Sequence, residues 1–169
     1  MLSNHIKINL VKTLILPIFD YACISYHDLP QYLENKVIRL LNYAIRFIFG
    51  LQKDVHITPY RTRANLLYPL NRRRYFIGCL FYKIFYTGCP SYLAELIHTS
   101  DSIRRTNRLN VAMDNIDTVY FIIPKTRTDI YYNSFTLTAE RFWNSVPLRI
   151  KTAPSLNIFA GLLLDFLSH

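Results

Sequence analysis

The chain has 169 residues, of which 51% are hydrophobic and 18% are charged, a composition typical of a folded globular protein that argues against a disordered one. Lysine and arginine number 20 against 11 acidic residues, and the formal charge of +9 suits phosphate-bearing or anionic-membrane partners as well as a plain basic domain. Three cysteines without a CxxC pair argue against a disulfide framework and favour a reduced intracellular setting, nuclear or cytoplasmic.

The first predicted element is a helix that Ser3 or Asn4 caps and that runs towards Tyr26. Its apolar residues follow three- and four-residue spacing: Ile6, Leu10, Leu14, Ile18 and Tyr21. Pro17 lies inside this pattern and is expected to kink or split the helix, because proline has no backbone N–H. The apolar run 14–19 is well under the length of about 20 residues that spans a bilayer, and no signal peptide is evident, so we expect no membrane association.

Asp28 and Pro30 predict the start of a second helix, as a cap and early-turn pair, and Gly50 predicts its end. Its predicted apolar stripe consists of Leu33, Val37, Leu40, Leu41, Ala44, Ile48 and Leu51. Three basic residues, Lys36, Arg39 and Arg46, project elsewhere on this helix.

Thr58 and Pro59 predict a short helix, and Asn71 and Gly88 bound a longer one. The longer helix is apolar nearly all round after its basic first turn, which is typical of a buried helix. Arginines at 72–74 are unusual there, because a helix N-terminus already carries partial positive charge. An acidic or phosphate partner would relieve the repulsion; alternatively, the side chains extend into water.

The polar residues 98–118 have no clear periodicity and are interpreted as a long loop or linker, and the β-branched residues 118–124 as an extended strand. A helix is expected over 131–144, with Phe135, Ala139, Phe142 and Trp143 on or near one face and Pro147 ending the region. Ser155 is predicted to cap a last helix that turns Phe159, Leu162, Leu163 and Phe166 inward.

These elements predict a mainly α fold: a helical hairpin or bundle, followed by a second small helical region with a short extended segment. The expected organisation is a helical pair over 1–57, a basic helical region over 58–98, a linker over 99–130 and a C-terminal helical pair over 131–169. Trp143 is the sole tryptophan and is expected to be buried.

Catalytic signatures are not found in the sequence. Two-metal nucleotidyl transfer needs clustered carboxylates, but no two acidic residues are adjacent, and Asp114 and Asp117 are better explained as loop-capping or solvated. Four separated glycines form no phosphate loop. Cys23 and His27 could face one side of a helix, but two ligands do not make a structural zinc site. The five histidines are scattered, so we expect no cofactor, no metal and no catalytic residue.

The remaining functional signal in the sequence is a set of basic residues mixed with tyrosines. Residues 60–110 contain nine basic and two acidic residues, which is most of the excess positive charge. Tyr60, Tyr68 and Tyr75 are interleaved with the arginines, which grip phosphates, while exposed tyrosines stack on bases. Core or boundary positions would explain these tyrosines equally well. The candidate nucleic-acid-binding residues are Lys36, Arg39, Arg46, Arg61, Arg63, Arg72, Arg73, Arg74 and Tyr75.

The order of several short segments resembles the thumb and post-thumb region of jockey- and CR1-like non-LTR retrotransposon reverse transcriptases. "VKTLILPIFDYACISY" is similar to the first thumb helix of that family, and "LENKVIRLLNYAIRFIFGLQKDVHITP" to its next helix. "YPLNRRRYF", "CPSYLAELI" and "IPKTRTDIYYNSF" resemble the segments that follow. The closing "WN.LP" pattern matches at Trp143, Asn144 and Pro147, which the resemblance makes structural residues.

The resemblance covers nearly the whole chain, but the fingers and the palm with its catalytic aspartates are missing, and Gly161 replaces a usual basic residue. It implies a truncated, non-catalytic fragment of an RNA-directed DNA polymerase, whose thumb helices hold the template–primer duplex by its backbone. The first hypothesis is therefore sequence-independent binding of RNA or an RNA–DNA duplex. The second is a remnant without a nucleic-acid role, which self-associates through the apolar surface that a missing palm exposes.

Overall fold

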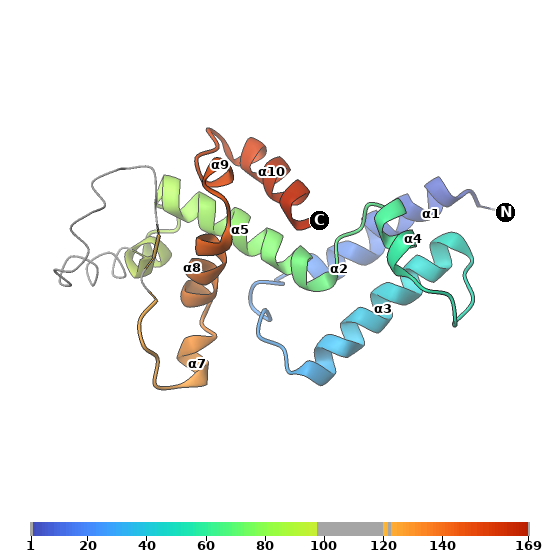
Figure 1. Cartoon of the computed structure of the whole chain (residues 1–169), viewed down its shortest axis with the longest axis horizontal. Helices are drawn as coiled ribbons and strands as arrows, with labels where there is room; N and C mark the ends of the chain where they lie inside the picture. Colours follow the sequence, from blue (N-terminus) through green and yellow to red (C-terminus); the bar gives the residue numbers. More distant parts are fainter. Residues whose placement is uncertain (1, 98–119, 122, 169) are drawn as a thin grey trace. The chain divides into compact units, whose positions relative to one another are not determined.

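The computed structural model describes residues 2–97, 120, 121 and 123–168, and it is mainly α-helical, as predicted (Figure 1). No β-strand occurs in this part of the chain. Within the strand predicted over 118–124, the described residues Tyr120, Phe121 and Ile123 have no regular secondary structure. The linker predicted over 98–118 lies outside the described residues. The chain forms two compact units. The N-terminal unit consists of the described residues up to Arg73, together with Ser168, and the C-terminal unit consists of the described residues from Arg74 to Leu167.

The first helix of the N-terminal unit has three consecutive parts: α1 (Asn4–Leu10), a π-helical segment (Val11–Ile15) and α2 (Leu16–Asp20). Ser3 caps α1, since its Oγ accepts a hydrogen bond from the Ile6 N–H at 3.4 Å. The predicted interruption at Pro17 is confirmed, because the hydrogen-bond pattern widens in the turn before this residue. The helix ends at Asp20, earlier than expected, and turns occupy residues 21–26.

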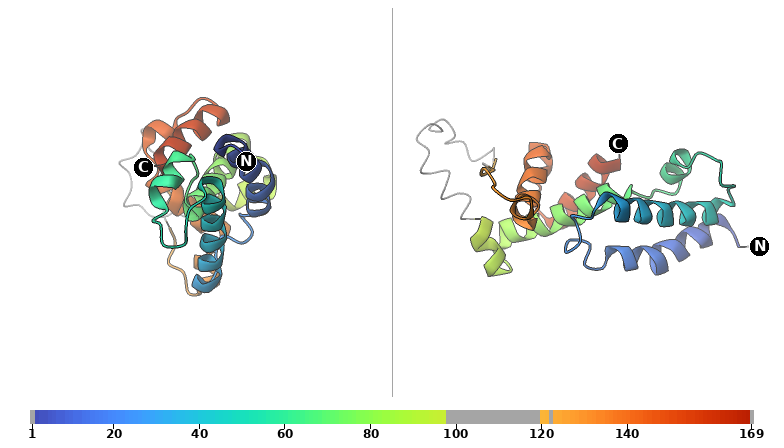
Figure 2. Two further views of the ribbon diagram at one scale, coloured as in Figure 1. Left: turned by 90° about the vertical axis from the view of Figure 1, so that its right-hand side faces the viewer. Right: turned by 90° about the horizontal axis from the view of Figure 1, so that it is seen from below.

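The core of the N-terminal unit lies between this helix and α3 (Gln31–Phe49), which run side by side (Figure 2). The buried residues of this cluster are Val11, Leu16, Leu41, Ala44 and Ile48. Burying each of the valine, leucine and isoleucine side chains of this cluster stabilises the fold by about 1.5–3 kcal/mol. By contrast, the periodic residues Ile6, Leu10, Leu14 and Ile18 are exposed. The first helix therefore has a second apolar face that is not covered.

The ends of α3 follow from Pro30 and Gly50. Pro30, not Asp28, stands at the N-cap and no side chain caps the helix, so the predicted role of Asp28 is wrong. Gly50 ends the helix in the left-handed region at φ 65°, as expected for a residue without a Cβ. Leu40 is 53% exposed, contrary to the predicted stripe, whereas Ile45 is buried.

Two further helices start in the N-terminal unit. The short α4 (Thr58–Arg63) carries Pro59 in its first turn, as predicted. Helix α5 (Pro69–Thr87) begins at Pro69, before the predicted Asn71, because proline suits a first turn whose N–H groups are unpaired anyway. Gly88 follows its end at φ 66°. Helix α5 continues into the C-terminal unit.

The C-terminal unit contains most of α5, a helix over 91–97, α7 (Asp129–Tyr132), α8 (Phe135–Ser145), α9 (Leu148–Lys151) and α10 (Leu156–Ser168) except its last residue. The single helix predicted over 131–144 is thus two helices, with a break at Asn133 and Ser134. Ser155 caps α10 as predicted, with its Oγ accepting from the Ile158 N–H at 3.4 Å.

Aromatic side chains form the core of the C-terminal unit. Trp143 is 1% exposed, as predicted, and its ring centroid lies 5.1 Å from that of Phe81 and 5.8 Å from that of Phe159. A Cβ on Gly78 would lie 2.7 Å from Leu163 Cδ2, so α5 and α10 approach closely there. The predicted inward residues of α10 are buried at Phe159 and Leu163, but Phe166 is exposed.

Asn144 and Pro147 have visible structural roles. The Asn144 side chain accepts from the Phe121 N–H at 2.9 Å and donates to the Phe121 carbonyl at 2.8 Å, as a neighbouring β-strand would. Pro147 stands at the N-cap of α9. No described helix has the length and apolar character needed to cross a membrane.

Candidate functional site

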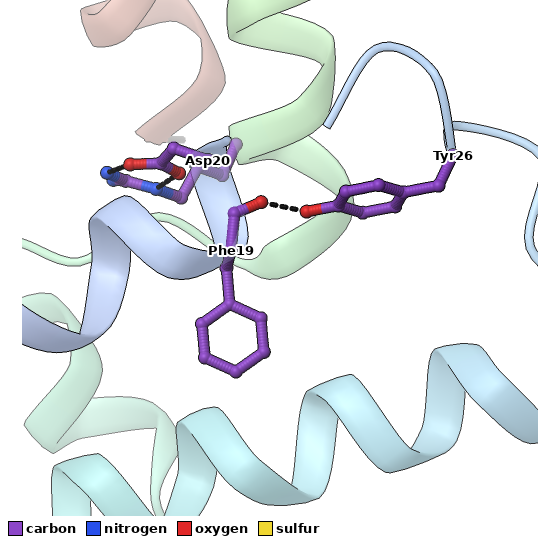
Figure 3. A network of polar contacts seen from close by, with 4 residues as sticks. Phe19, Asp20 and Tyr26 are labelled. Carbon is purple, nitrogen blue, oxygen red and sulfur yellow. Dashed lines mark hydrogen bonds and ion pairs between the residues drawn. The ribbon is translucent and has the colours of Figure 1, made fainter. Parts of the chain in front are cut away.

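Two of the three arginines at the start of α5 are paired with carboxylates of the N-terminal unit. Arg72 donates from Nε and from a terminal nitrogen to the two carboxylate oxygens of Asp20, both at 2.5 Å (Figure 3). Figure 3 also shows the Tyr26 hydroxyl donating to the carbonyl of Phe19, which lies in α2. Arg73, which is buried, pairs with Glu34 of α3.

These ion pairs answer the question that the basic first turn of α5 raised, whether an acidic or a phosphate partner relieves the repulsion. Asp20 and Glu34 supply the negative charge within the unit. A buried arginine that is already bound to a carboxylate has little to offer a phosphate, because the internal pair would first have to break. Arg72 and Arg73 therefore join the N-terminal helices to α5.

Lys36 and Arg39 lie on the exposed side of α3, together with aromatic rings. The exposed rings on this side are Tyr32, Tyr43 and Phe47. The Lys36 ammonium lies 5.7 Å from the Tyr32 ring centroid, a cation–π distance. We call this surface the α3 face; it combines cations for phosphates with aromatic rings for bases or sugars.

A cleft of about 370 Å³ opens beside the α3 face, within the N-terminal unit. It lies between α3, the loop 51–57 and α4, and Tyr68 also lines it. The three cationic residues that line the cleft are Arg46, Arg61 and Lys53, and one acidic residue, Asp54, also lines it. Two of the predicted nucleic-acid-binding residues thus meet in one concave site.

Neutral oxygens and an aromatic ring position the two cleft arginines. Arg46 donates to the backbone carbonyls of Gln52 and Lys53, at 3.3 and 2.9 Å, and so fastens the loop to α3. Arg61 donates to the Asn42 side-chain oxygen at 2.5 Å, and its guanidinium lies 4.9 Å from the Tyr68 ring centroid. Burial lowers the pKa of Arg61, although arginine stays protonated at neutral pH.

The cleft arginines differ from Arg72 and Arg73 in one respect that bears on anion binding. Within the part of the chain that the structure describes, no carboxylate lies at ion-pair distance from Arg46 or Arg61. The groups that hold these two guanidinium groups in place are neutral, so the positive charges are not neutralised. A bound anion would gain this charge without displacing an internal partner.

The other predicted residues lie apart from the cleft. Arg63 is exposed at the end of α4, with its guanidinium 5.9 Å from the Phe49 ring centroid. Arg74 is exposed and Tyr75 half-buried in the C-terminal unit, so neither belongs to this site. The predicted set omitted Lys53; its position three residues after Gly50, in a loop that returns towards α3, was the available signal.

No metal site emerges from the described residues. Three or more His, Cys, Asp or Glu side chains do not meet in a ligand cluster there, and the His27 Nδ1 contacts the Ile24 carbonyl at 2.7 Å. Burial, with a further contribution from Asp20, raises the pKa of the Cys23 thiol. Asp114 and Asp117 lie outside the described residues.

Comparisons with protein-family models, with curated proteins and with solved structures found no match to this chain.

Proposed function

We propose that this chain is a non-catalytic fragment of a retrotransposon reverse transcriptase that binds the backbone of RNA or of an RNA–DNA duplex without sequence preference. The observation that carries the proposal is the cleft, where Arg46, Arg61 and Lys53 converge and where the described residues provide no ion-pair partner for them. Phosphates are the ligands that such positioned cations favour.

The α3 face extends the same chemistry over a longer surface. Lys36 and Arg39 supply two further cations, and Tyr32 and Tyr43 supply exposed rings. Phosphate contacts and stacking are both independent of base identity, which favours binding without sequence preference. The proposed function includes no polymerase chemistry, since the sequence has no adjacent acidic residues for a two-metal site.

The family resemblance supports the proposed location. The segment that is similar to the second thumb helix forms α3 and the loop that closes the cleft. In that family, thumb helices lie beside the template–primer duplex. The charge distribution and the resemblance are separate arguments for the same surface.

Fluorescence anisotropy of the full chain with two RNA–DNA duplexes of unrelated sequence tests the proposal. The double variant Lys36→Ala/Arg39→Ala should weaken binding to both duplexes by a similar factor, about tenfold. The matched control is Lys125→Ala/Arg149→Ala, which removes two exposed charges from the C-terminal unit and should leave binding nearly unchanged. Equal losses in both variants, or binding to only one duplex, would refute the proposal.

A second candidate function, self-association, is favoured by the uncovered apolar face of the first helix. Leu2, Ile6, Leu10, Leu14 and Ile18 recur every fourth residue and are all exposed. Such a contiguous apolar stripe favours association with another apolar surface. Sedimentation velocity should then show concentration-dependent oligomers that Leu14→Gln/Ile18→Gln removes; a monomer at all concentrations would contradict this function.

A further inference from the structure

The cleft differs from the α3 face in shape. The α3 face is one side of a helix, which can follow a continuous backbone. The cleft is concave, and its volume of about 370 Å³ falls within the range of small-ligand pockets, roughly 300–1,000 Å³. A strand that lies along the α3 face can place an internal phosphate at the rim of the cleft, with a nucleoside on each side, whereas a chain end can enter the cleft with only one nucleoside.

The charge of the cleft also favours a chain end. Three cations and one carboxylate line it, and these four groups have a net charge of +2. An internal phosphodiester carries one negative charge, whereas a phosphate monoester carries about 1.5 to 2 at neutral pH, because its second pKa is about 6. The monoester matches the charge of the lining more closely.

The hydrogen-bond donors of the cleft are only partly used. A guanidinium has five N–H donors, of which Arg46 uses two and Arg61 uses one in the contacts described above. Asn42 and the Tyr68 ring fix the plane of the Arg61 guanidinium. A planar donor held in place binds phosphate oxygens with less loss of side-chain freedom than a mobile lysine.

We propose that the cleft binds a terminal phosphate monoester of a nucleotide, with Arg61 and Arg46 as the principal donors and Lys53 at the loop. The inference rests on the proposed nucleic-acid binding and specifies how the strand is placed. The chain holds a phosphorylated strand end in the cleft, and the neighbouring backbone lies along the α3 face. The same chemistry is present in a free nucleoside monophosphate, which is the other source of the ligand.

The test compares binding of the full chain to one RNA–DNA duplex that carries either a 5′-phosphate or a 5′-hydroxyl. The phosphorylated duplex should bind about tenfold more tightly. Arg61→Lys keeps the charge but loses the planar donor, and should remove most of this difference. Because Arg61 also contacts Asn42, Lys53→Ala provides a second variant with an exposed side chain, and Lys12→Ala provides a matched control in the same unit that does not line the cleft.

The outcomes separate the inference from the proposed function. Equal affinity for the two duplexes would overturn the terminal-phosphate site and leave backbone binding intact, whereas binding of neither would overturn both. A preference that Lys12→Ala removes as fully as Lys53→Ala would also overturn the site. If uridine monophosphate competes with the phosphorylated duplex and shifts the Arg61 Nε–H NMR signal, the phosphate monoester itself suffices as ligand. If the chain prefers the phosphorylated duplex but uridine monophosphate does not compete with it, the site is specific for strand ends.

Discussion

The pair Arg73–Glu34 offers the sharpest test of how the N-terminal unit is held together. The side chains are 8% and 15% exposed, so water screens the pair little. Replacing one partner by alanine leaves the other charge buried, and Arg73→Ala or Glu34→Ala should each lower the free energy of unfolding by about 3–5 kcal/mol.

The double variant is expected to behave differently. Glu34 Oε1 and one terminal nitrogen of Arg73 have no hydrogen-bond partner among the described residues, so the pair recovers only part of its desolvation cost. Arg73→Met/Glu34→Leu replaces both groups by apolar side chains and should cost less than either single alanine variant. The three losses are therefore expected to be strongly non-additive.

Urea unfolding followed by circular dichroism at the helical band measures these differences. Unfolding of both single variants at the wild-type urea concentration would contradict a stabilising role for the pair. So would a double variant whose loss of unfolding free energy equals the sum of the two single losses. The result also bears on binding assays, because alanine variants of Arg72 and Arg73 would lower stability together with any nucleic-acid affinity. Arg74→Ala, at an exposed position, is the matched control.

Three other predictions concern the C-terminal unit. Trp143→Ala should cost about 3–5 kcal/mol in urea unfolding, because the indole is buried among aromatic rings, and a water-exposed emission spectrum of the native protein would contradict this. Asn144→Ala should cost about 1–3 kcal/mol, since the Phe121 N–H and carbonyl lose their partners; a loss no larger than that of an exposed control would count against the role. Burial raises the pKa of the Cys79 thiol to about 11, so this thiol should react slowly with iodoacetamide at pH 8. Mass spectrometry should find the exposed Cys89 alkylated far sooner, and the alkylation rate at Cys79 should rise as the pH approaches 11. Equal alkylation rates at pH 8 would contradict the burial of Cys79.

Local signals explain which parts of the fold could be predicted from the sequence. Gly50 and Gly88 end helices because their left-handed backbone is costly for other residues, and Ser155 caps α10 through its own hydroxyl. Such effects depend on a few neighbouring residues. The ends at Gly50 and Gly88 therefore follow from the sequence. The end of the first helix at Asp20 and the break at Asn133 do not, because the apolar spacing continues across both.

Long-range pairing explains what could not be predicted. Arg72 and Asp20 are separated by 52 residues, and nothing near either one indicates the partner. The sequence left three explanations open for the arginines: a carboxylate partner, a phosphate partner, or side chains that extend into water. The cleft was beyond prediction for the same reason, because it forms only when the loop after Gly50 is fastened to Arg46.

The salt dependence of duplex binding tests the central claim most directly, because the claim is that cations of the N-terminal unit neutralise backbone phosphates. Arg72 and Arg73 have internal partners, so the phosphate contacts expected in this unit are the cations of the α3 face and of the cleft: Lys36, Arg39, Arg46, Lys53 and Arg61. Five neutralised phosphates predict that log K falls with log salt at a slope near −4.5, from about −0.9 for each contact. Anisotropy titrations of an RNA–DNA duplex over a range of potassium chloride concentrations should give this slope for unrelated sequences, and a slope near zero would contradict the account.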